Sequence, residues 1–292
     1  APDALTYLRP LRGVTHTPLV RSDGSLLAAS GYDRATGYLH LPGEGVNVPP
    51  VPERPTSDQV RAAVRLLDEM TTGFPWQSVD DRANYYGLLL TPLLRQIVPP
   101  PYKMFGINAH QPGSGKTLLA SVAGIIHERV TRSELPEDEG EMRKQTSAIL
   151  STTSAPMVHI DNVTGIVRSP YLAGLLTMGP EAFTDRELGA SRNLTMINDR
   201  VWVLTGNNLS LGGDLVRRTI TINIDPDMPN PETRTGFAIT DLEAWARGQR
   251  NELLAALLTI VRAWVAQGMP EVKRKQSDGF ARWSRVLGGI LQ

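Results

Sequence analysis

The chain of 292 residues is 41% hydrophobic and 21% charged, which is typical of a globular protein with one to three domains. It has no cysteine, which excludes disulfides, thiolate zinc sites and thiol nucleophiles, and it has no long apolar run or signal-peptide pattern, so we expect a cytoplasmic location and no membrane partner. Thirty basic and thirty acidic residues give a formal net charge of zero, so a polyanion would have to be bound by a local basic patch. The chain starts at Ala1 and stops at Gln292 inside an apolar run, and we interpret it as a fragment of a longer protein.

Residues 1–55 are predicted to form a small antiparallel β unit. Their short apolar stretches are separated by turn signals at Asp23-Gly24 and at Thr36-Gly37. The proline-rich segment "VPPVPERP" follows, and we predict that it is a linker.

Residues 56–98 are predicted to be helical. Thr56 and Gln59 have the spacing of a capping box, and the apolar residues that follow recur at helical spacing. A second helix is predicted to start at Ser78 and to bend at Pro92.

A glycine-rich stretch, "HQPGSGKT" at 110–117, lies between the predicted strand "YKMFGIN" and the predicted helix "TLLASVAGIIHE". Strand, loop and helix in this order are the context of a phosphate-binding loop. Glycines let the backbone fold around phosphates, so that N–H groups and the helix N-terminus point at the anion. The residues expected to bind ATP are Pro112, Gly113, Ser114, Gly115, Lys116, Thr117 and Leu118.

Two side chains of this loop have expected chemical roles. Lys116 would reach the β- and γ-phosphates, and the Thr117 hydroxyl would ligate Mg²⁺. His110 stands where the usual pattern has its first glycine, but that position only starts the turn. The alternative is a glycine-rich turn that binds no ligand.

The segment "APMVHIDNV" at 155–163 is predicted to be an apolar strand, neighbouring the first, that ends in a metal-ordering acid. We expect Asp161 to hold Mg²⁺ through water as the Walker B acid, and His159 to be a core residue. The alternative for Asp161 is a capping role at a turn. Asn162 follows it, and an amide can orient water but cannot accept its proton. Either a loose transition state needs only the orientation of water by Asn162, or another carboxylate serves, for which Glu141 is a candidate.

A third strand, "DRVWVLTGNN" at 199–208, ends in polar residues. Because such residues face the ligand crevice of an open α/β sheet, we expect Asn207 to be a sensor of the γ-phosphate or of the attacking water. Arg217 or Arg218 in "GGDLVRRTITINI" is a candidate arginine finger for a neighbouring subunit. The alternative is a surface salt bridge with Asp214.

The order of these motifs resembles that of the AAA+ and superfamily 3 helicase group. It is more closely similar to the replicative helicase ATPases of bacteriophages and integrative mobile elements, which are related to MCM helicases. The segments "TPLVRSDGSLLAASGYDRATGYLHLP", "TDRELGAS", "TGNN" and "DGFARWSRVLGGIL" are also similar to that group. The resemblance implies a hexameric ring that hydrolyses ATP between subunits and moves along single-stranded or forked DNA.

The expected fold is therefore α/β, with an AAA+-like P-loop core around a central parallel sheet. The predicted domains are a β unit at 1–55, a helical segment at 56–98, the ATPase core at 99–228 and a C-terminal helical segment at 229–292. In this last segment, one long helix is predicted to open with a capping box of Thr240 and Glu243 and to end near Gly268.

A DNA contact is expected from a hairpin in "DRELGASRNLTMIND" at 185–199, with Arg192 at its tip. In the motors that this chain resembles, a hairpin there projects into the central pore. The alternatives are an exposed hairpin with a solvated arginine and, for the basic "KRK" at 273–275, a solvated loop.

Two other functions remain open at this point. The first is an ATP-controlled initiator or loader that binds DNA without processive unwinding, which Asn162 favours because it suggests slow turnover. The second is a P-loop kinase for a small molecule, although no acceptor site is evident and a monomeric kinase needs no arginine from a neighbour.

Overall fold

A computed structural model describes residues 9–181, 183–186, 193–273 and 278–292. Its centre is a five-stranded sheet with the strand order β14-β6-β12-β8-β7, and every pairing in it is parallel. The strands are β6 (Met104–Ala109), β7 (Arg129–Arg132), β8 (Met157–Val163), β12 (Val201–Asn207) and β14 (Thr219–Asn223). The carboxyl ends of all five strands therefore lie at one edge of the sheet, which confirms the expected α/β architecture.

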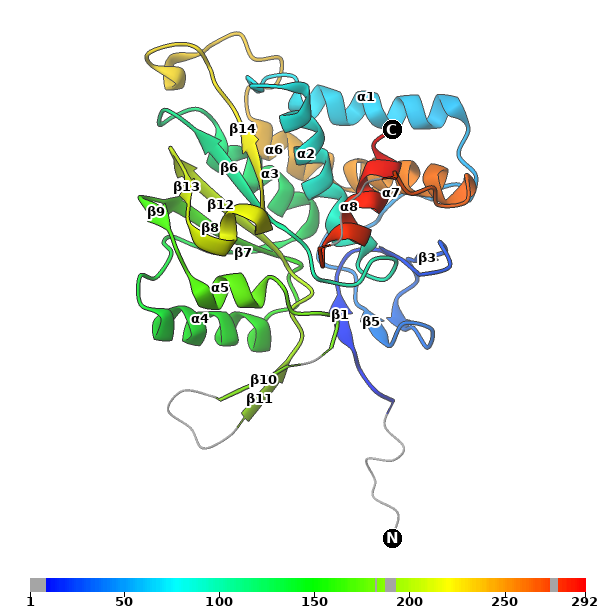
Figure 1. Ribbon diagram of the computed structural model, residues 1–292. Helices are drawn as coiled ribbons and strands as arrows, with labels where there is room; N and C mark the ends of the chain where they lie inside the picture. Colours follow the sequence, from blue (N-terminus) through cyan, green and yellow to red (C-terminus); the bar gives the residue numbers. More distant parts are fainter. Residues whose placement is uncertain (1–8, 182, 187–192, 274–277) are drawn as a thin grey trace.

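The sheet separates two hydrophobic cores, because alternate residues of each strand point to opposite faces. Val201 and Val203 of β12 belong to one core, whereas Trp202 and Leu204 belong to the other. Helices cover both faces in Figure 1. The first core is closed by α1 (Ser57–Thr71), α2 (Val79–Leu90), α3 (Lys116–His127), α7 (Arg250–Ala266) and α8 (Ala281–Ile290). The second core is closed by α4 (Glu139–Thr152), α5 (Pro170–Leu175) and the 3-10 helix η3 (Gly213–Arg218).

The helix starts predicted for residues 56–98 are confirmed. Thr56 and Gln59 form the capping box of α1, and the Ser78 hydroxyl accepts a hydrogen bond from the backbone N of Asp81 at the start of α2. The chain then leaves α2 for the 3-10 helix η2 (Thr91–Leu94), which contains Pro92 and accounts for the predicted bend.

The single long helix predicted near the C-terminus is wrong. The chain forms α6 (Leu242–Gly248) and α7, which meet at Gln249. The cap of α6 is Asp241, whose carboxylate accepts a hydrogen bond from the backbone N of Ala244 at 2.9 Å. Thr240 and Glu243 are therefore not a capping box, because Asp241 already satisfies the first turn.

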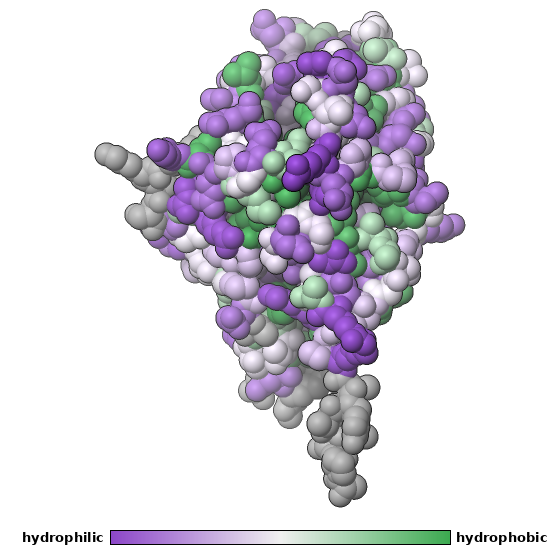
Figure 2. All heavy atoms as spheres, turned by 90° about the vertical axis from the view of Figure 1, so that its right-hand side faces the viewer, coloured by the Kyte–Doolittle hydropathy of each residue, from purple (hydrophilic) through white to green (hydrophobic). Residues whose placement is uncertain are grey.

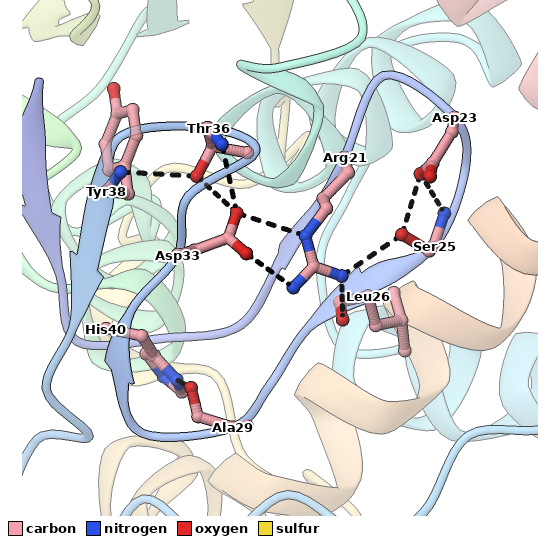
Figure 3. A network of polar contacts seen from close by, with 9 residues as sticks. All are labelled: Arg21, Asp23, Ser25, Leu26, Ala29, Asp33, Thr36, Tyr38 and His40. Atoms are coloured by element: carbon pink, nitrogen blue, oxygen red, sulfur yellow. Dashed lines mark hydrogen bonds and ion pairs between the residues drawn. The ribbon is translucent and has the colours of Figure 1, made fainter.

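The N-terminal β unit contains the predicted turns but is not wholly antiparallel. Its strands are β1 (Gly13–Thr15), β2 (Leu19–Val20), β3 (Leu26–Leu27), β4 (Gly31–Tyr32) and β5 (Tyr38–His40). The pairs β2–β3 and β4–β5 are antiparallel hairpins, as predicted, whereas β1 runs parallel to β5. Arg21 joins the two hairpins, since its guanidinium donates to Asp33, Ser25 and the carbonyl of Leu26 (Figure 3).

A buried ion pair attaches this β unit to the rest of the molecule. The Tyr38 hydroxyl donates to Asp199 at 2.8 Å, and Arg95 Nη1 lies 3.2 Å from the same carboxylate oxygen. Asp199 lies two residues before the start of β12 at Val201, and Arg95 directly follows η2. The network therefore joins the N-terminal unit, the helical segment and the central sheet.

The predicted hairpin is confirmed as the antiparallel pair β10 (Phe183–Arg186) and β11 (Asn193–Met196), which extends away from the body of the molecule in Figure 1. Among the described residues, no helix is both long and apolar enough to cross a membrane. On the face that Figure 2 shows, hydrophilic and hydrophobic side chains are interspersed. The remaining short elements are β9 (Ile166–Val167), β13 (Ser210–Leu211) and the 3-10 helix η4 (Pro231–Thr233).

Candidate functional site

The glycine-rich loop joins the carboxyl end of β6 to the start of α3, as the sequence predicts. Gly113 has φ 71° and Gly115 has φ 98°, which is a backbone conformation that side chains disfavour. A Cβ on Gly113 would lie 3.1 Å from the backbone N of Glu232, and a Cβ on Gly115 would lie 3.1 Å from the Phe74 ring. Conformation and close packing therefore both require glycine at these two positions.

His110 ties the loop to the neighbouring strand. Its Nδ1 donates to Asn208 Oδ1 at 2.9 Å, and Asn208 Nδ2 donates back to the His110 carbonyl at 3.3 Å. The backbone N of Asn208 also donates to the carbonyl of Ala109 at 2.9 Å. The residue that replaces the usual first glycine thus fastens the start of the turn to the end of β12.

Lys116 is brought together with the predicted sensor. Its ammonium donates to the Gln111 carbonyl at 3.0 Å and to Asn207 Oδ1 at 2.6 Å. Burial lowers the pKa of Lys116, and the nearby Asp161 carboxylate partly offsets that effect. A cation with little solvent around it, held by neutral oxygens, is well suited to bind an anion.

Thr117 and Asp161 also meet, because the Thr117 hydroxyl donates to Asp161 Oδ1 at 3.0 Å. The expectation that Asp161 lies on a strand adjacent to β6 is wrong, since β12 runs between β6 and β8. Burial tends to raise the pKa of Asp161, but hydrogen bonds from Thr205 and Thr117 hold it below its usual value. Asp161 is therefore a carboxylate at neutral pH.

The pair fits the chemistry of a Mg²⁺ site. Mg²⁺ prefers oxygen ligands and usually takes one or two from the protein, while phosphates and water supply the others. The Thr117 hydroxyl and the Asp161 carboxylate are two such oxygens beside the loop. In the described ranges there is no cluster of three or more His, Asp or Glu residues that would hold a metal by itself.

Asn162 lies in a β-bulge. Pairing between β8 and β12 shifts there, from Leu204 opposite Ile160 to Gly206 opposite Val163. Asn162 has φ 54°, in the left-handed region that asparagine tolerates better than most residues, and its side chain is exposed. Asparagine suits this position because the backbone of the bulge is left-handed there.

Gly206 makes the bulge possible. A Cβ at this position would lie 2.5 Å from the carbonyl oxygen of Val163, which is closer than a side chain can approach. The first residue after Thr205 in "TGNN" must therefore be glycine, because the backbone of β8 approaches β12 closely at this point.

Glu141 is not brought to the site by any contact of the described residues. Its carboxylate accepts hydrogen bonds from Gln145 at 3.0 Å and from Lys144 at 3.4 Å, both within α4. The hydrogen bond from Gln145 is the main cause that lowers the pKa of Glu141. The helix that carries Glu141, α4, packs against α5 and β11. No described contact therefore supports Glu141 as a base at Asp161.

The two candidate finger arginines differ in their surroundings. The Arg217 side chain is 71% exposed and pairs with Asp214 at 2.9 Å. Arg218 is only 13% exposed, because it donates to the Ala173 carbonyl and also pairs with Asp214 at 2.9 Å. Of the two, Arg217 is the one whose guanidinium is accessible to another molecule.

Both arginines lie far from the glycine-rich loop of their own chain. They directly precede β14, whose Thr219 is paired with Met104 at the start of β6. The loop follows the other end of β6. Arg217 and Lys116 therefore lie at opposite edges of the same parallel sheet.

Arg192, the predicted DNA contact, lies outside the described residues. The base of its hairpin is fixed to the body, since Arg143 Nε donates to Asp185 Oδ1 at 2.7 Å and Ser147 donates to Oδ2 at 3.3 Å. The structure therefore describes how the hairpin is anchored to α4.

A cavity of about 450 Å³ lies next to the loop, and the sequence did not predict it. Gly113, Ser114, Gly115 and Leu118 form one wall of it. The opposite wall comes from the end of α1 with the turn after it and from the segment that runs from η4 to the start of α6, and includes Met70, Phe74, Phe237, Ile239 and Leu242. No periodic pattern marks these residues, which come together only through the packing of distant segments.

Thr205 is a second residue that the sequence did not predict. Its hydroxyl donates to Asp161 and lies 3.0 Å from Nε2 of His159. His159 is fully buried, as predicted, and burial lowers its pKa to about 4, so that it is neutral at pH 7. A threonine in an apolar strand gives no sequence signal beyond its place two residues before Asn207.

No protein-family model and no curated protein matches the chain. Solved structures with some similarity include the A-form apo structure of the NrS-1 C-terminal region, at 16% identity and a TM-score of 0.46, covering 76% of this chain and 49% of that one. The X-ray structure of JCV helicase is 14% identical with a TM-score of 0.37, covering 81% of this chain and 60% of that one. The chain thus spans about half the length of the NrS-1 region. Similarity at this level carries no argument about function, which rests on the geometry of the site.

Proposed function

We propose that the chain is an ATP-hydrolysing DNA motor of the helicase type. The observation that carries the proposal is the convergence of a loop lysine, a loop threonine, a strand-end carboxylate and a strand-end amide at one edge of the sheet. Lys116 contacts Asn207 at 2.6 Å and Thr117 contacts Asp161 at 3.0 Å. These are the parts that phosphoryl transfer from a nucleoside triphosphate requires.

In this proposal the loop residues 112–118 bind the phosphates of ATP. Lys116 neutralises charge on the β- and γ-phosphates, and Asn207 orients the γ-phosphate or the attacking water. Thr117 and Asp161 would hold Mg²⁺, which supplies neutralisation of the phosphate oxygens when it is bound.

The cavity beside the loop would receive the base of the nucleotide. Its volume of about 450 Å³ is within the range of small-molecule sites, and its wall opposite the loop combines aromatic and aliphatic side chains with polar ones such as Glu69 and Arg234. Phe74 and Phe237 provide flat apolar surfaces of the kind on which a base stacks.

Hydrolysis would take place between subunits of a ring, which we expect to be a hexamer. Arg217 is exposed and lies at the edge of the sheet opposite the loop, so it cannot serve its own site without a large rearrangement. In a ring, the same surface faces the site of a neighbour. Arg217 is therefore the proposed finger, and Arg218 anchors it to α5.

The proposed DNA contact is the hairpin β10–β11, with Arg192 gripping a phosphate of single-stranded or forked DNA. Its support is the hairpin itself and its anchoring through Asp185 to α4. A local contact of this kind fits a chain of zero formal net charge.

A second function is an ATP-controlled DNA-binding initiator or loader that does not unwind processively. Asn162 favours it, because this side chain cannot accept a proton from water and its left-handed backbone disfavours glutamate at the same position. Slow hydrolysis with tight ATP binding would be the signature of such a switch.

ATPase rates with and without single-stranded DNA, followed by strand displacement on a forked duplex, distinguish these functions. A motor shows DNA-stimulated hydrolysis and displaces the strand. A switch binds ATP and DNA but displaces no strand. If an oligomer of the full protein shows neither stimulation nor displacement, the motor proposal is contradicted.

A further inference from the structure

One oxygen of Asp161 carries all the hydrogen bonds that this carboxylate receives from the described residues. Oδ1 accepts from the Thr117 hydroxyl at 3.0 Å, from the backbone N of Asn162 at 2.9 Å and from the Thr205 hydroxyl. Within the described ranges, no donor lies on Oδ2. The carboxylate is thus held in one orientation, with its second oxygen free to accept from a ligand.

The contact from Thr205 has a fixed direction. A carboxylate oxygen has no proton, so the Thr205 hydroxyl must donate its only proton to Asp161. The hydroxyl can then only accept from His159, whose Nε2 lies 3.0 Å away and must carry the ring proton. His159 thus donates a hydrogen bond to Thr205, and Thr205 donates one to Asp161.

This series of hydrogen bonds comes from buried residues, unlike the exposed hydrogen bond between Thr117 of the loop and Asp161. Thr205 is 1% exposed and His159 is 0% exposed. Thr205 lies on β12 at the point where the pairing with β8 shifts, between Leu204 and Gly206. Its hydroxyl therefore spans the gap that the bulge opens beside Asp161, where regular pairing is interrupted.

We propose that Thr205, held by His159, is a positioning residue of the nucleotide site, which orients the Asp161 carboxylate so that Oδ2 faces the Mg²⁺ that accompanies ATP. This inference rests on the proposed nucleotide-binding function. Groups that orient a metal ligand from behind typically change metal affinity ~10- to 100-fold when they are removed. The effect of Thr205 should therefore be on the contribution of Mg²⁺ to ATP binding and not on metal-free binding.

The test is calorimetric titration of ATP into the 292-residue chain, once in EDTA and once in MgCl₂. Thr205→Val keeps the shape of the side chain but removes the hydroxyl, and Thr205→Ser keeps the hydroxyl. Thr259→Val is the matched control, because among the described residues the hydroxyl of this buried threonine bonds only to the Ala255 carbonyl within its own helix.

We expect all four proteins to bind ATP equally in EDTA. In MgCl₂, the wild type, Thr205→Ser and Thr259→Val should gain affinity, while Thr205→Val should lose about tenfold or more of that gain. His159→Phe, which removes the donor behind Thr205, should lose part of it, and this variant decides the question if Thr205→Val fails to fold.

The inference would be overturned if folded Thr205→Val gained as much ATP affinity from Mg²⁺ as the wild type. If Thr205→Val does not fold, the same result in His159→Phe would overturn it. The proposed function would remain intact in both cases. If the wild type itself binds no ATP, the proposed function fails, and the inference fails with it. The two failures are therefore distinguishable in one set of titrations.

Discussion

The Thr117 hydroxyl donates a hydrogen bond to Asp161 across 3.0 Å, although β6, which precedes Thr117, and β8, which contains Asp161, are separated by β12. The contact is possible because all five strands are parallel and end at the same edge of the sheet. The intervening strand β12 ends in Asn207, whose Oδ1 lies 2.6 Å from Lys116 Nζ. The site is thus assembled from three strand ends and one helix start.

Asn162 is expected to position water and not to bind the nucleotide. Asn162→Gly keeps the left-handed backbone at φ 54° but removes the amide, so ATP binding should be unchanged and turnover should fall roughly tenfold or more. Asn162→Ala loses the same amide and adds backbone strain of about 1 kcal/mol, which should also lower the thermal midpoint. Steady-state ATPase assays and thermal melts measure both effects. Wild-type turnover in Asn162→Gly would exclude a water-positioning role.

Arg217→Ala should cut turnover by about 10³-fold or more while ATP binding and stability remain unchanged, because its guanidinium is exposed and is proposed to act on a neighbouring subunit's site. Arg218→Ala should instead destabilise the fold by about 1–3 kcal/mol, since it leaves the Ala173 carbonyl without its donor. ATPase rates and urea unfolding separate the two roles. If both variants hydrolyse ATP normally, the shared-site arrangement is wrong.

Gly206→Ala should disturb the bulge on which Asp161 and Asn162 depend. The new Cβ would lie 2.5 Å from the Val163 carbonyl, and relief of that clash should cost roughly 1–3 kcal/mol of stability and weaken Mg²⁺-dependent ATP binding. Gly174→Ala is the matched control, because no described residue outside its own helical turn lies within 4 Å of the added carbon and α5 should tolerate alanine. Urea unfolding of both variants measures the difference, and equal stabilities would argue against the close approach at Gly206.

Phe237→Ala should weaken binding of ATP about tenfold, since it removes an aromatic wall of the cavity beside the loop. Binding of inorganic triphosphate should be unchanged, because that ligand has no base. Val79→Ala serves as a control, as this side chain is 82% exposed and does not line the cavity. Equal losses for ATP and triphosphate would place the base elsewhere.

Local signals predicted much of the core and which residues meet at the candidate site. The glycine spacing before Lys116 predicted the loop, and the polar residues after apolar runs predicted that Asp161 and Asn207 lie at strand ends, because both features depend on short stretches of chain. Caps were predicted well where one side chain was available, as at Ser78, and poorly where Thr240 competed with Asp241.

The parts that the sequence did not predict depend on contacts between distant segments. The strand order, which places β12 between β6 and β8, is a property of the whole sheet. The cavity wall around Phe74 and Phe237 brings together residues that are separated by most of the chain. The role of Thr205 depends on a bulge, and no local pattern in β8 marks where the pairing shifts.

Calorimetric titration of Mg²⁺-ATP into the wild type and Lys116→Ala tests the central claim most directly, because Lys116 is the loop cation that is proposed to bind the phosphates. Lys144→Ala is the control, since its side chain is 61% exposed and pairs with Glu141 on α4. We predict that the wild type and Lys144→Ala bind Mg²⁺-ATP alike and that Lys116→Ala loses measurable binding and turnover. Wild-type affinity in folded Lys116→Ala, or no binding by the wild type, would contradict the nucleotide site.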